Sequence, residues 1–217
     1  MSQPPFRVVF MSGARGSGKK TAAKIIADTA ATGPYVIDAF LFEMRERCHA
    51  AFKLFDPQRL PVHPLYFEES LDVPLGVFHG TPRAAYARFA QFARDVMGPQ
   101  VEGDWVAGRL RYFRRMQQEK LERGMISKVA RGTIIVDMPQ YTADSVVYRP
   151  IVDYVGAENC TVLHIERAGS GIAQHICLDG VRGVRVRNPG DSVAAFETAI
   201  RKAAPHLYIE IAQSLSE

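Results

Sequence analysis

The stretch MSGARGSGKKT, residues 11–21, follows an apolar run and precedes apolar side chains at helical spacing. The run Arg7–Met11 is typical of a buried strand, and Ala22–Ile26 of a helix. The glycines match the pattern G-x-x-x-x-G-K-[ST] up to its last position, where Lys20 replaces the hydroxyl and Thr21 comes one residue late. Strand, glycine loop and helix therefore occur in the order that this motif requires.

The loop predicts a site for nucleotide phosphates, with a plain strand–helix turn as the alternative. Backbone N–H groups of residues 14–19 and the start of the helix would converge on an anion, while Lys19 supplies a charge to the terminal phosphates. Arg15 is predicted either to reach the nucleotide or to be merely exposed, and Lys20 is more typical of a solvated helix residue. The predicted nucleotide-binding set is Gly13, Ala14, Arg15, Gly16, Ser17, Gly18, Lys19, Lys20 and Thr21.

Length and composition are those of a globular protein. The chain has 217 residues, 47% hydrophobic and 23% charged, which suits a single domain over residues 1–217. Its net charge of +4 is compatible with anionic substrates without identifying one. Three scattered cysteines, Cys48, Cys160 and Cys177, predict free thiols, and the sequence shows neither a signal peptide nor a membrane span. The cytoplasm is the expected location.

Apolar runs alternate with helical patterns along the chain. This order predicts an α/β fold with a doubly wound parallel sheet flanked by helices. Residues 56–80 are rich in proline, glycine and aromatic residues and predict a long loop or cap. The expected further strands are Tyr35–Ile37, Thr133–Asp137, Thr161–Ile165 and Val184–Val186. The expected helices are Phe40–Phe55, Pro82–Met97 capped by Thr81, Trp105–Arg123 capped by Asp104, and Ser192–Ala203.

Phosphate loops ending in G-K-x-T are common in nucleoside monophosphate kinases, and further segments resemble the bacteriophage deoxynucleoside monophosphate kinase family. The matching segments are Ser12–Thr21, loosely Val36–Leu41, Thr81-Pro82-Arg83, Arg94, Asp104-Trp105-Val106 and Asn188–Asp191. The resemblance touches most of the chain in order. It implies a P-loop NTPase-type fold with an acceptor-binding insert over residues 56–125 and a lid-like segment over residues 167–187. ATP and Mg²⁺ are the implied cofactors, and a homodimer remains open.

The resemblance also implies roles for individual residues. Thr21 would contact the α-phosphate, and Lys19, Asp38 and Arg83 would take part in catalysis. Asp38, Arg83, Arg94 and Trp105 would bind the acceptor, and Arg167 and Arg182 would belong to the lid. Asp137 would hold Mg²⁺ through water. Each role has a competing interpretation: a helix cap for Asp38 and Asp137, an ion pair for Arg94, core packing for Trp105 and a solvated basic loop for the lid arginines.

The segments expected to bind the acceptor depart from the family. Leu41 stands where a lysine is usual, Ala90-Gln91-Phe92 replaces G-T-[DE], and residues 137–143 read DMPQYTA instead of D-V-R-F-x-N-E. Three functions therefore stay open. The first is a kinase that phosphorylates a deoxynucleoside monophosphate in the cytoplasm, which would be the host's if the protein is viral. The second is a kinase acting on 5-hydroxymethyluracil in phage DNA, and the third is a nucleotide-binding module without transferase activity.

Overall fold

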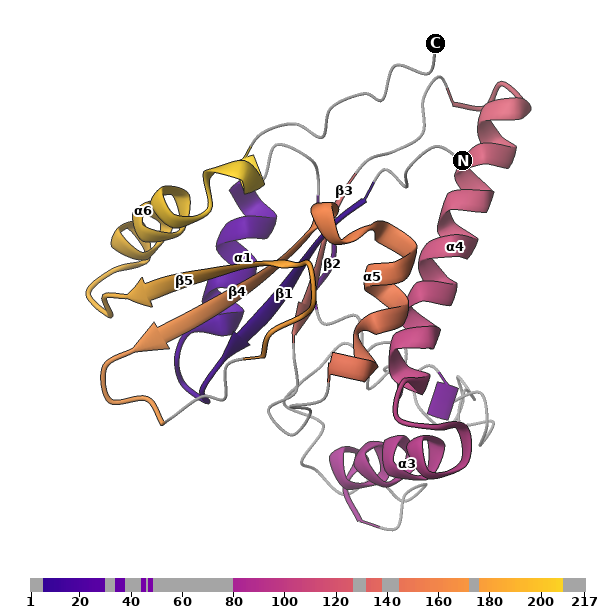
Figure 1. Ribbon diagram of the computed structural model, residues 1–217, viewed down its shortest axis with the longest axis horizontal. Helices are drawn as coiled ribbons and strands as arrows, with labels where there is room; N and C mark the ends of the chain where they lie inside the picture. The colour runs from indigo at the N-terminus through magenta and orange to yellow at the C-terminus, as the bar shows by residue number, and fades with distance from the viewer. Residues whose placement is uncertain are drawn as a thin grey trace.

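Five parallel strands form the central sheet in the computed structural model (Figure 1). They are β1 (Phe6–Gly13), β2 (Pro34–Ile37), β3 (Gly132–Asp137), β4 (Cys160–Arg167) and β5 (Arg182–Asn188), in the spatial order β2-β3-β1-β4-β5. The structure describes residues 6–29, 34–37, 44–45, 47–48, 80–126, 132–137, 145–171 and 176–208. The predictions for Asp38 and for residues 49–79 lie outside the described residues.

Alternate side chains of the central strand face opposite sides of the sheet. Phe6, Val8 and Phe10 of β1 join one buried cluster, whereas Val9 and Met11 join the other. All five side chains are at most 1% exposed. A strand that is buried on both faces needs a continuous apolar run rather than an alternating pattern, and this is the run that marks β1 in the sequence.

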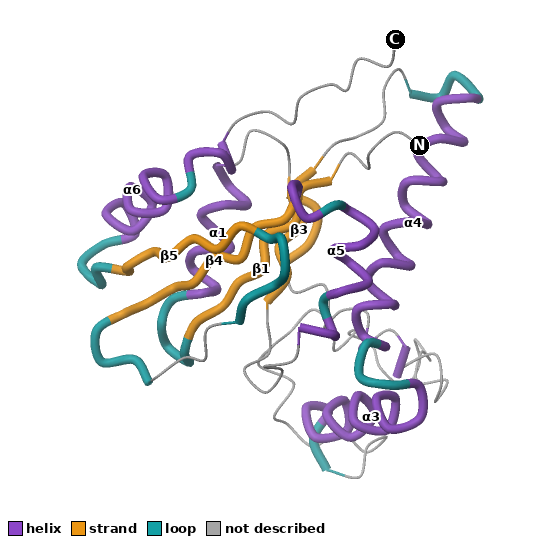
Figure 2. Tube along the Cα trace, in the orientation of Figure 1, coloured by secondary structure: helices purple, strands orange, loops and turns teal. Residues whose placement is uncertain are grey.

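Helices cover both faces of the sheet (Figures 1 and 2). Helices α1 (Lys19–Thr29) and α6 (Val193–Ala203) pack on the face of Val9, and α4 (Val101–Glu122) and α5 (Arg149–Val155) pack on the face of Phe10. Helix α3 (Pro82–Met97) packs against α4 away from the sheet. Three 3-10 turns complete the described elements: η3 (Ser145–Val147), η4 (Ala157–Asn159) and η5 (Pro205–Tyr208).

The connections leave β1 and β3 in opposite directions. Helix α1 follows β1 on one face of the sheet and leads past β3 to β2, whereas α5 lies between β3 and β4 on the other face. Neighbouring strands whose helices lie on opposite faces form a topological switch point, and open α/β sheets bind ligands beyond the carboxyl ends of such strands. The carboxyl end of β1 at this point is the start of the glycine loop.

The predicted fold class, a doubly wound parallel α/β sheet flanked by helices, is confirmed. The predicted bounds of α3 are also confirmed: Thr81 accepts a hydrogen bond from the Ala84 N–H at 3.3 Å, and Gly98 ends the helix with φ +98°. At α6 the Ser192 hydroxyl accepts from the Ala195 N–H at 3.1 Å. Such caps are contacts within one helical turn, so a local sequence pattern can predict them.

The predicted start of α4 is wrong. Asp104 does not cap this helix but lies in its first turn, where its N–H donates to the Gln100 carbonyl at 3.0 Å. The helix starts earlier because a tight turn, closed by the Val101 N–H donating to the Gly98 carbonyl at 3.2 Å, leads directly into it. Val101 is 2% exposed, so burial of its side chain favours the early start. Helix α5 was not predicted from the sequence.

The three cysteines are free, as predicted: Cys48 and Cys160 are buried and Cys177 is exposed. Burial raises the pKa of the Cys48 thiol to about 11 and that of Cys160 to about 12, so both remain protonated at neutral pH. Among the described residues, no helix combines the length and the apolar composition needed to cross a bilayer.

Candidate phosphate-binding site

The loop between β1 and α1 is curled. Gly13, Gly16 and Gly18 have φ values of +148°, +80° and +102°, a region that glycine enters far more readily than other residues. The Ser17 N–H donates to the Ala14 carbonyl at 3.2 Å and closes a turn. The backbone therefore reverses direction over residues 14–17 before it enters the helix, as a phosphate-cradling loop requires.

Two of the loop glycines are also required by close packing. A Cβ atom on Gly13 would come within 2.5 Å of the Ile165 carbonyl oxygen, and one on Gly18 within 2.5 Å of Nδ2 of Asn188. A Cβ atom on Gly16 would meet nothing within 4 Å. The base of the loop is thus pressed against β4 and β5, while its tip at Gly16 faces open space.

Asn188 at the end of β5 holds the loop in place. Its side-chain Nδ2 donates to the Ser17 carbonyl at 2.9 Å, and its Oδ1 accepts from the Gly190 N–H at 3.0 Å. Asn188 is 8% exposed, so both hydrogen bonds are largely shielded from water. Sequence analysis included Asn188 in a segment that resembles the kinase family but gave it no role, because a contact over 171 residues leaves no local signal.

The start of α1 is positively charged and has no acidic residue in its first turn. Lys19 and Lys20 lie at the helix end where the macrodipole is already positive, an arrangement that lowers helix stability until an anion binds. The half-buried Lys19 folds back over the loop, where its Nζ donates to the Gly13 carbonyl at 2.7 Å and to the Ala14 carbonyl at 3.4 Å. Lysine charge, helix dipole and backbone amides all favour an anion at this point.

The hydroxyl groups near the loop differ in their surroundings. Ser17 is fully buried, its Oγ lies 2.7 Å from the position of a Cβ atom on Gly13, and among the described residues this oxygen has no hydrogen-bond partner. Thr21 is exposed in the first turn of α1. The side chain of Ser17 is thus buried under the loop backbone. Thr21 carries the hydroxyl that is available to a ligand on the open side of the helix start.

The carboxyl ends of β2, β3 and β1 meet at one edge of the sheet. Asp137, the last residue of β3, is in register with Met11 of β1, two residues before Gly13. The backbone of Asp137 therefore reaches the switch point. Its side chain lies outside the described residues, so its role near Mg²⁺ stays a prediction. Asp38 directly follows β2 and is not described, so its role stays a prediction.

The structure separates the two arginines predicted for a lid. Arg167 ends β4 at the carboxyl edge of the sheet, where its Nε lies 3.4 Å from the position of a Cβ atom on Gly190. Arg182 instead begins β5 opposite Thr161, six residues before Asn188 and roughly 20 Å away along the strand. Residues 182–187 belong to the sheet and cannot form part of a lid. The prediction of a lid over residues 167–187 is therefore wrong for residues 182–187, including Arg182.

The residues predicted to bind the acceptor lie on α3 and α4. Arg83 is exposed near the start of α3. The Arg94 guanidinium forms an ion pair with the buried Glu102 at 2.8 Å, which joins α3 to α4. Trp105 stacks on Phe89 with ring centroids 6.2 Å apart, and the Arg47 guanidinium lies 5.7 Å from its ring centroid. The structure thus gives Arg94 and Trp105 packing roles, and their contacts with an acceptor stay predictions.

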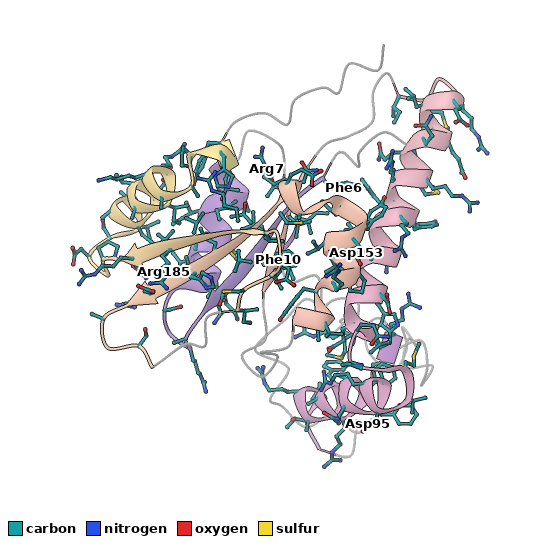
Figure 3. All side chains as sticks on the ribbon, in the orientation of Figure 1. Phe6, Arg7, Phe10, Asp95, Asp153 and Arg185 are labelled. Carbon is teal, nitrogen blue, oxygen red and sulfur yellow. The ribbon has the colours of Figure 1, made fainter. Side chains whose placement is uncertain are left out.

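Among the described residues no group of three or more His, Cys, Asp or Glu side chains is placed to hold a metal ion. Figure 3 labels Arg185 on β5 and Asp95 on α3, which lie far apart across the molecule in this view. The curled loop follows β1 of the sheet, whereas α3 packs against α4 away from the sheet.

The fold and the loop define a class of protein. A central parallel strand, a curled glycine loop ending in lysine and a helix that starts at that lysine form the arrangement of P-loop proteins.

No protein-family model matches the chain, and a comparison with curated proteins finds no match. Among solved structures, an unliganded sugar kinase from Janibacter sp. HTCC2649 aligns with 94% of this chain and 99% of its own. The sequence identity is 14% and the TM-score 0.33. At this score the alignment adds nothing to the class defined above.

Proposed function

We propose that the protein is an ATP-dependent phosphotransferase whose acceptor is a deoxynucleoside monophosphate. The observation that carries the proposal is the start of α1, where two lysines and a curled glycine loop concentrate positive charge without an acidic residue. A structural turn would gain nothing from this arrangement, whereas a triphosphate would be held by it.

The loop residues suit the phosphates of ATP. The amides of residues 14–19 would surround the β-phosphate, and Lys19 would exchange its contacts with the Gly13 and Ala14 carbonyls for oxygens of the transferring group. Thr21 would contact the α-phosphate. Bound Mg²⁺ would neutralise charge on the phosphate tail, and the carboxylate of Asp137 is the group proposed to hold it through water.

In the proposed reaction, an oxygen of the acceptor phosphate forms a bond to the γ-phosphorus as the bond to the β–γ bridging oxygen breaks, and ADP leaves. The protein's contribution is alignment and charge neutralisation. Lys19 and Arg167 supply cations near the loop, and Asp38 is proposed to orient the acceptor. Arg83, exposed at the start of α3, is proposed to bind the acceptor phosphate, with Arg94 and Trp105 supporting the acceptor from α3 and α4.

The test offers ATP labelled at the γ-phosphate to the full chain with each deoxynucleoside monophosphate, and separately with DNA that contains 5-hydroxymethyluracil. Label in a deoxynucleoside diphosphate supports the proposal. Label in DNA would show that the acceptor is a base in DNA, while the reaction would still be phosphoryl transfer. If ATP binds but label reaches neither acceptor, the remaining function is that of a nucleotide-binding module.

A further inference from the structure

The C-terminal half of α3 exposes an apolar surface. Among the described residues seven large hydrophobic side chains are exposed, and three of them lie within six residues of this helix. They are Phe92, Val96 and Met97, with exposed fractions of 62%, 66% and 58%. Single exposed apolar side chains are common on soluble proteins, whereas a contiguous group of them marks a contact surface.

Helix α3 has two apolar stripes. The first packs within the chain and consists of the buried residues Pro82, Tyr86, Ala90 and Ala93. The second, the outer stripe, runs beside it at intervals of four, three and four residues and consists of Ala85, Phe89, Phe92 and Val96. This spacing is that of a helix that packs along another helix. The first two residues of the outer stripe are half-buried and the last two are exposed, so the chain itself covers only its beginning.

The inner side of α3 is anchored to α4. Phe89 stacks on Trp105 with ring centroids 6.2 Å apart, and Arg94 forms an ion pair with Glu102 at 2.8 Å. Figure 1 shows α3 at one end of the molecule, beyond the start of α4. An anchored helix presents its outer stripe in a fixed geometry, which lowers the entropic cost of binding a partner.

Two opposite charges flank the outer stripe on the same side. Arg88 and Asp95 are both exposed, and they are seven residues, or two helical turns, apart. They are separated by roughly 10 Å along the helix axis, which is too far for an ion pair within one helix. Gln91 positions the carboxylate, because its Nε2 donates to Oδ1 of Asp95 at 2.7 Å.

This placement of charge is self-complementary. When two copies of α3 pack antiparallel about a two-fold axis near the middle of the outer stripe, Arg88 of each copy lies beside Asp95 of the other. Two equivalent ion pairs then form, one on each side of the axis. A parallel arrangement would instead bring each residue beside its own copy, arginine beside arginine and aspartate beside aspartate.

We propose that the outer stripe of α3 is a self-association surface, on which α3 of a second copy of this chain packs antiparallel. Phe89 of one copy then meets Phe92 of the other, and the two rings form an aromatic pair. Val96 meets Ala85, so a larger side chain lies opposite a smaller one at each end of the contact. The stripe is about 16 Å long, so the interface is small and the dimer is expected to dissociate in the micromolar range.

A second copy fits this surface better than a membrane does. A helix that lies on an anionic bilayer carries an excess of basic residues along its polar side, whereas the two charges that flank the outer stripe cancel. A two-fold axis requires opposite charges at equal distances on either side of it, and the pair of Arg88 and Asp95 meets this requirement. The proposal does not involve the phosphate loop and holds whether or not the protein transfers phosphate.

Sedimentation velocity of the full chain without ATP, over concentrations from about 1 to 200 µM, measures the association. The double variant Phe92→Gln and Val96→Gln removes two exposed apolar side chains and keeps good helix formers. The matched control, Tyr112→Gln and Val193→Gln, removes two similarly exposed side chains from α4 and α6. We expect the parent chain to dimerise, the α3 variant to raise the dissociation constant at least about tenfold, and the control to change it less than about threefold.

An exchange of charges tests the antiparallel arrangement. Arg88→Glu alone and Asp95→Arg alone each place like charges side by side across the axis, so each should weaken the dimer by about tenfold. The variant with both substitutions restores opposite charges and should return to within about threefold of the parent dissociation constant. Because the two residues are too far apart to pair within one helix, such a recovery identifies a contact between copies.

Three results would each overturn the proposal. They are a parent chain that stays monomeric over the whole concentration range, a dimer that the α3 apolar variant leaves as tight as the parent, and a double charge variant that is no tighter than the single ones. Thermal unfolding shows whether each variant is folded. The charge variants change only exposed side chains, so they decide the question even where the apolar variant does not fold.

Discussion

The side-chain amide of Asn188 donates to the Ser17 carbonyl at 2.9 Å and so ties the end of β5 to the loop that follows β1. Its side-chain carbonyl oxygen accepts a hydrogen bond from the N–H of Gly190, which lies in the turn that leads into α6. One side chain thus fixes two backbone segments that meet at the carboxyl edge of the sheet. These hydrogen bonds favour one shape of the loop, and a pre-formed shape lowers the entropic cost of binding.

Replacing Asn188 tests this tie. Asn188→Ala leaves the Ser17 carbonyl and the Gly190 N–H without the amide, and we expect a loss of about 1–3 kcal/mol in the free energy of unfolding. The affinity for ATP should fall as well, because the loop loses its support. Urea unfolding and ATP titration measure the two effects. Asn188→Asp keeps the acceptor for Gly190 and loses the donor to Ser17, so an unchanged ATP affinity in this variant would contradict the role given to the Ser17 contact.

Alanine at two loop glycines should have unequal effects. Both Gly16 and Gly18 have positive φ, so each substitution costs about 1–2 kcal/mol in backbone strain. Gly18→Ala also drives a methyl group to 2.5 Å from Asn188 Nδ2, whereas Gly16→Ala meets nothing within 4 Å. We expect Gly18→Ala to lower the thermal midpoint of unfolding several degrees further than Gly16→Ala. Equal midpoints would show that the close approach at Gly18 relaxes without cost.

Much of this candidate site can be predicted from local sequence patterns, but some of its contacts cannot. The strand, the glycine loop and the helix start are encoded in consecutive residues, and so are the caps Thr81 and Ser192. The contact between Asn188 and Ser17 depends on how five strands are ordered, which no short window contains. The family resemblance implied a lid role for Arg182, but strand register places it at the start of β5, at the other end of the strand from Asn188.

Element lengths explain the other differences. Helix α5 has seven residues, too few for the apolar spacing of a helix to repeat clearly, and it was missed. Helix α4 begins before Asp104 because Val101 is buried and Gly103 packs closely on η3, which are tertiary effects. Sequence pattern therefore predicts elements that are stabilised locally, and it fails where packing between elements sets the boundary.

Lys19 provides the sharpest test of phosphoryl transfer. We expect Lys19→Ala to lower the transfer rate by at least 10²–10³-fold, because the cation that stabilises the transferring phosphate is lost. Folding should change little. The variant loses two hydrogen bonds to the Gly13 and Ala14 carbonyls, but it also removes a cation from the positive end of α1. Steady-state kinetics and thermal unfolding separate the two effects.

The matched control for Lys19 is Lys24→Ala, which removes an exposed lysine later on the same helix. This variant should keep the parent transfer rate. A parent-like transfer rate in Lys19→Ala would instead show that the loop takes no part in the reaction.

His206 should make stability depend on pH. Burial lowers its pKa below the ordinary value of 6.5, and the Arg182 and Arg7 guanidinium groups lower it further. The ring accordingly favours the neutral form, hydrogen-bonded through Nε2 to the Thr161 hydroxyl at 3.0 Å. Because the unfolded chain takes up a proton more readily, this contribution is complete above pH 6.5 and is lost as pH falls through the folded pKa.

Urea unfolding at pH 7.5 and at pH 5.5 measures this contribution. His206→Gln has no group that titrates here, so its stability should fall less between the two pH values than that of the parent chain. Parallel losses in the two proteins would assign the acid sensitivity to other residues.

Two glycines on α4 should respond oppositely to the same substitution. A Cβ atom on Gly103 would lie 1.9 Å from the Val147 carbonyl oxygen, a backbone atom that cannot swing away as a side chain can. A Cβ atom on Gly108 would meet nothing within 4 Å. Gly108→Ala should therefore raise the free energy of unfolding by about 0.5–1 kcal/mol through helix propensity alone. Gly103→Ala should lower it by about 1–3 kcal/mol despite the same gain, because α4 must shift away from η3. Chemical denaturation measures the free energy of unfolding of the two variants. If Gly103→Ala is more stable than the parent chain, α4 does not pack closely on η3, and this contact cannot explain why the helix starts before Asp104.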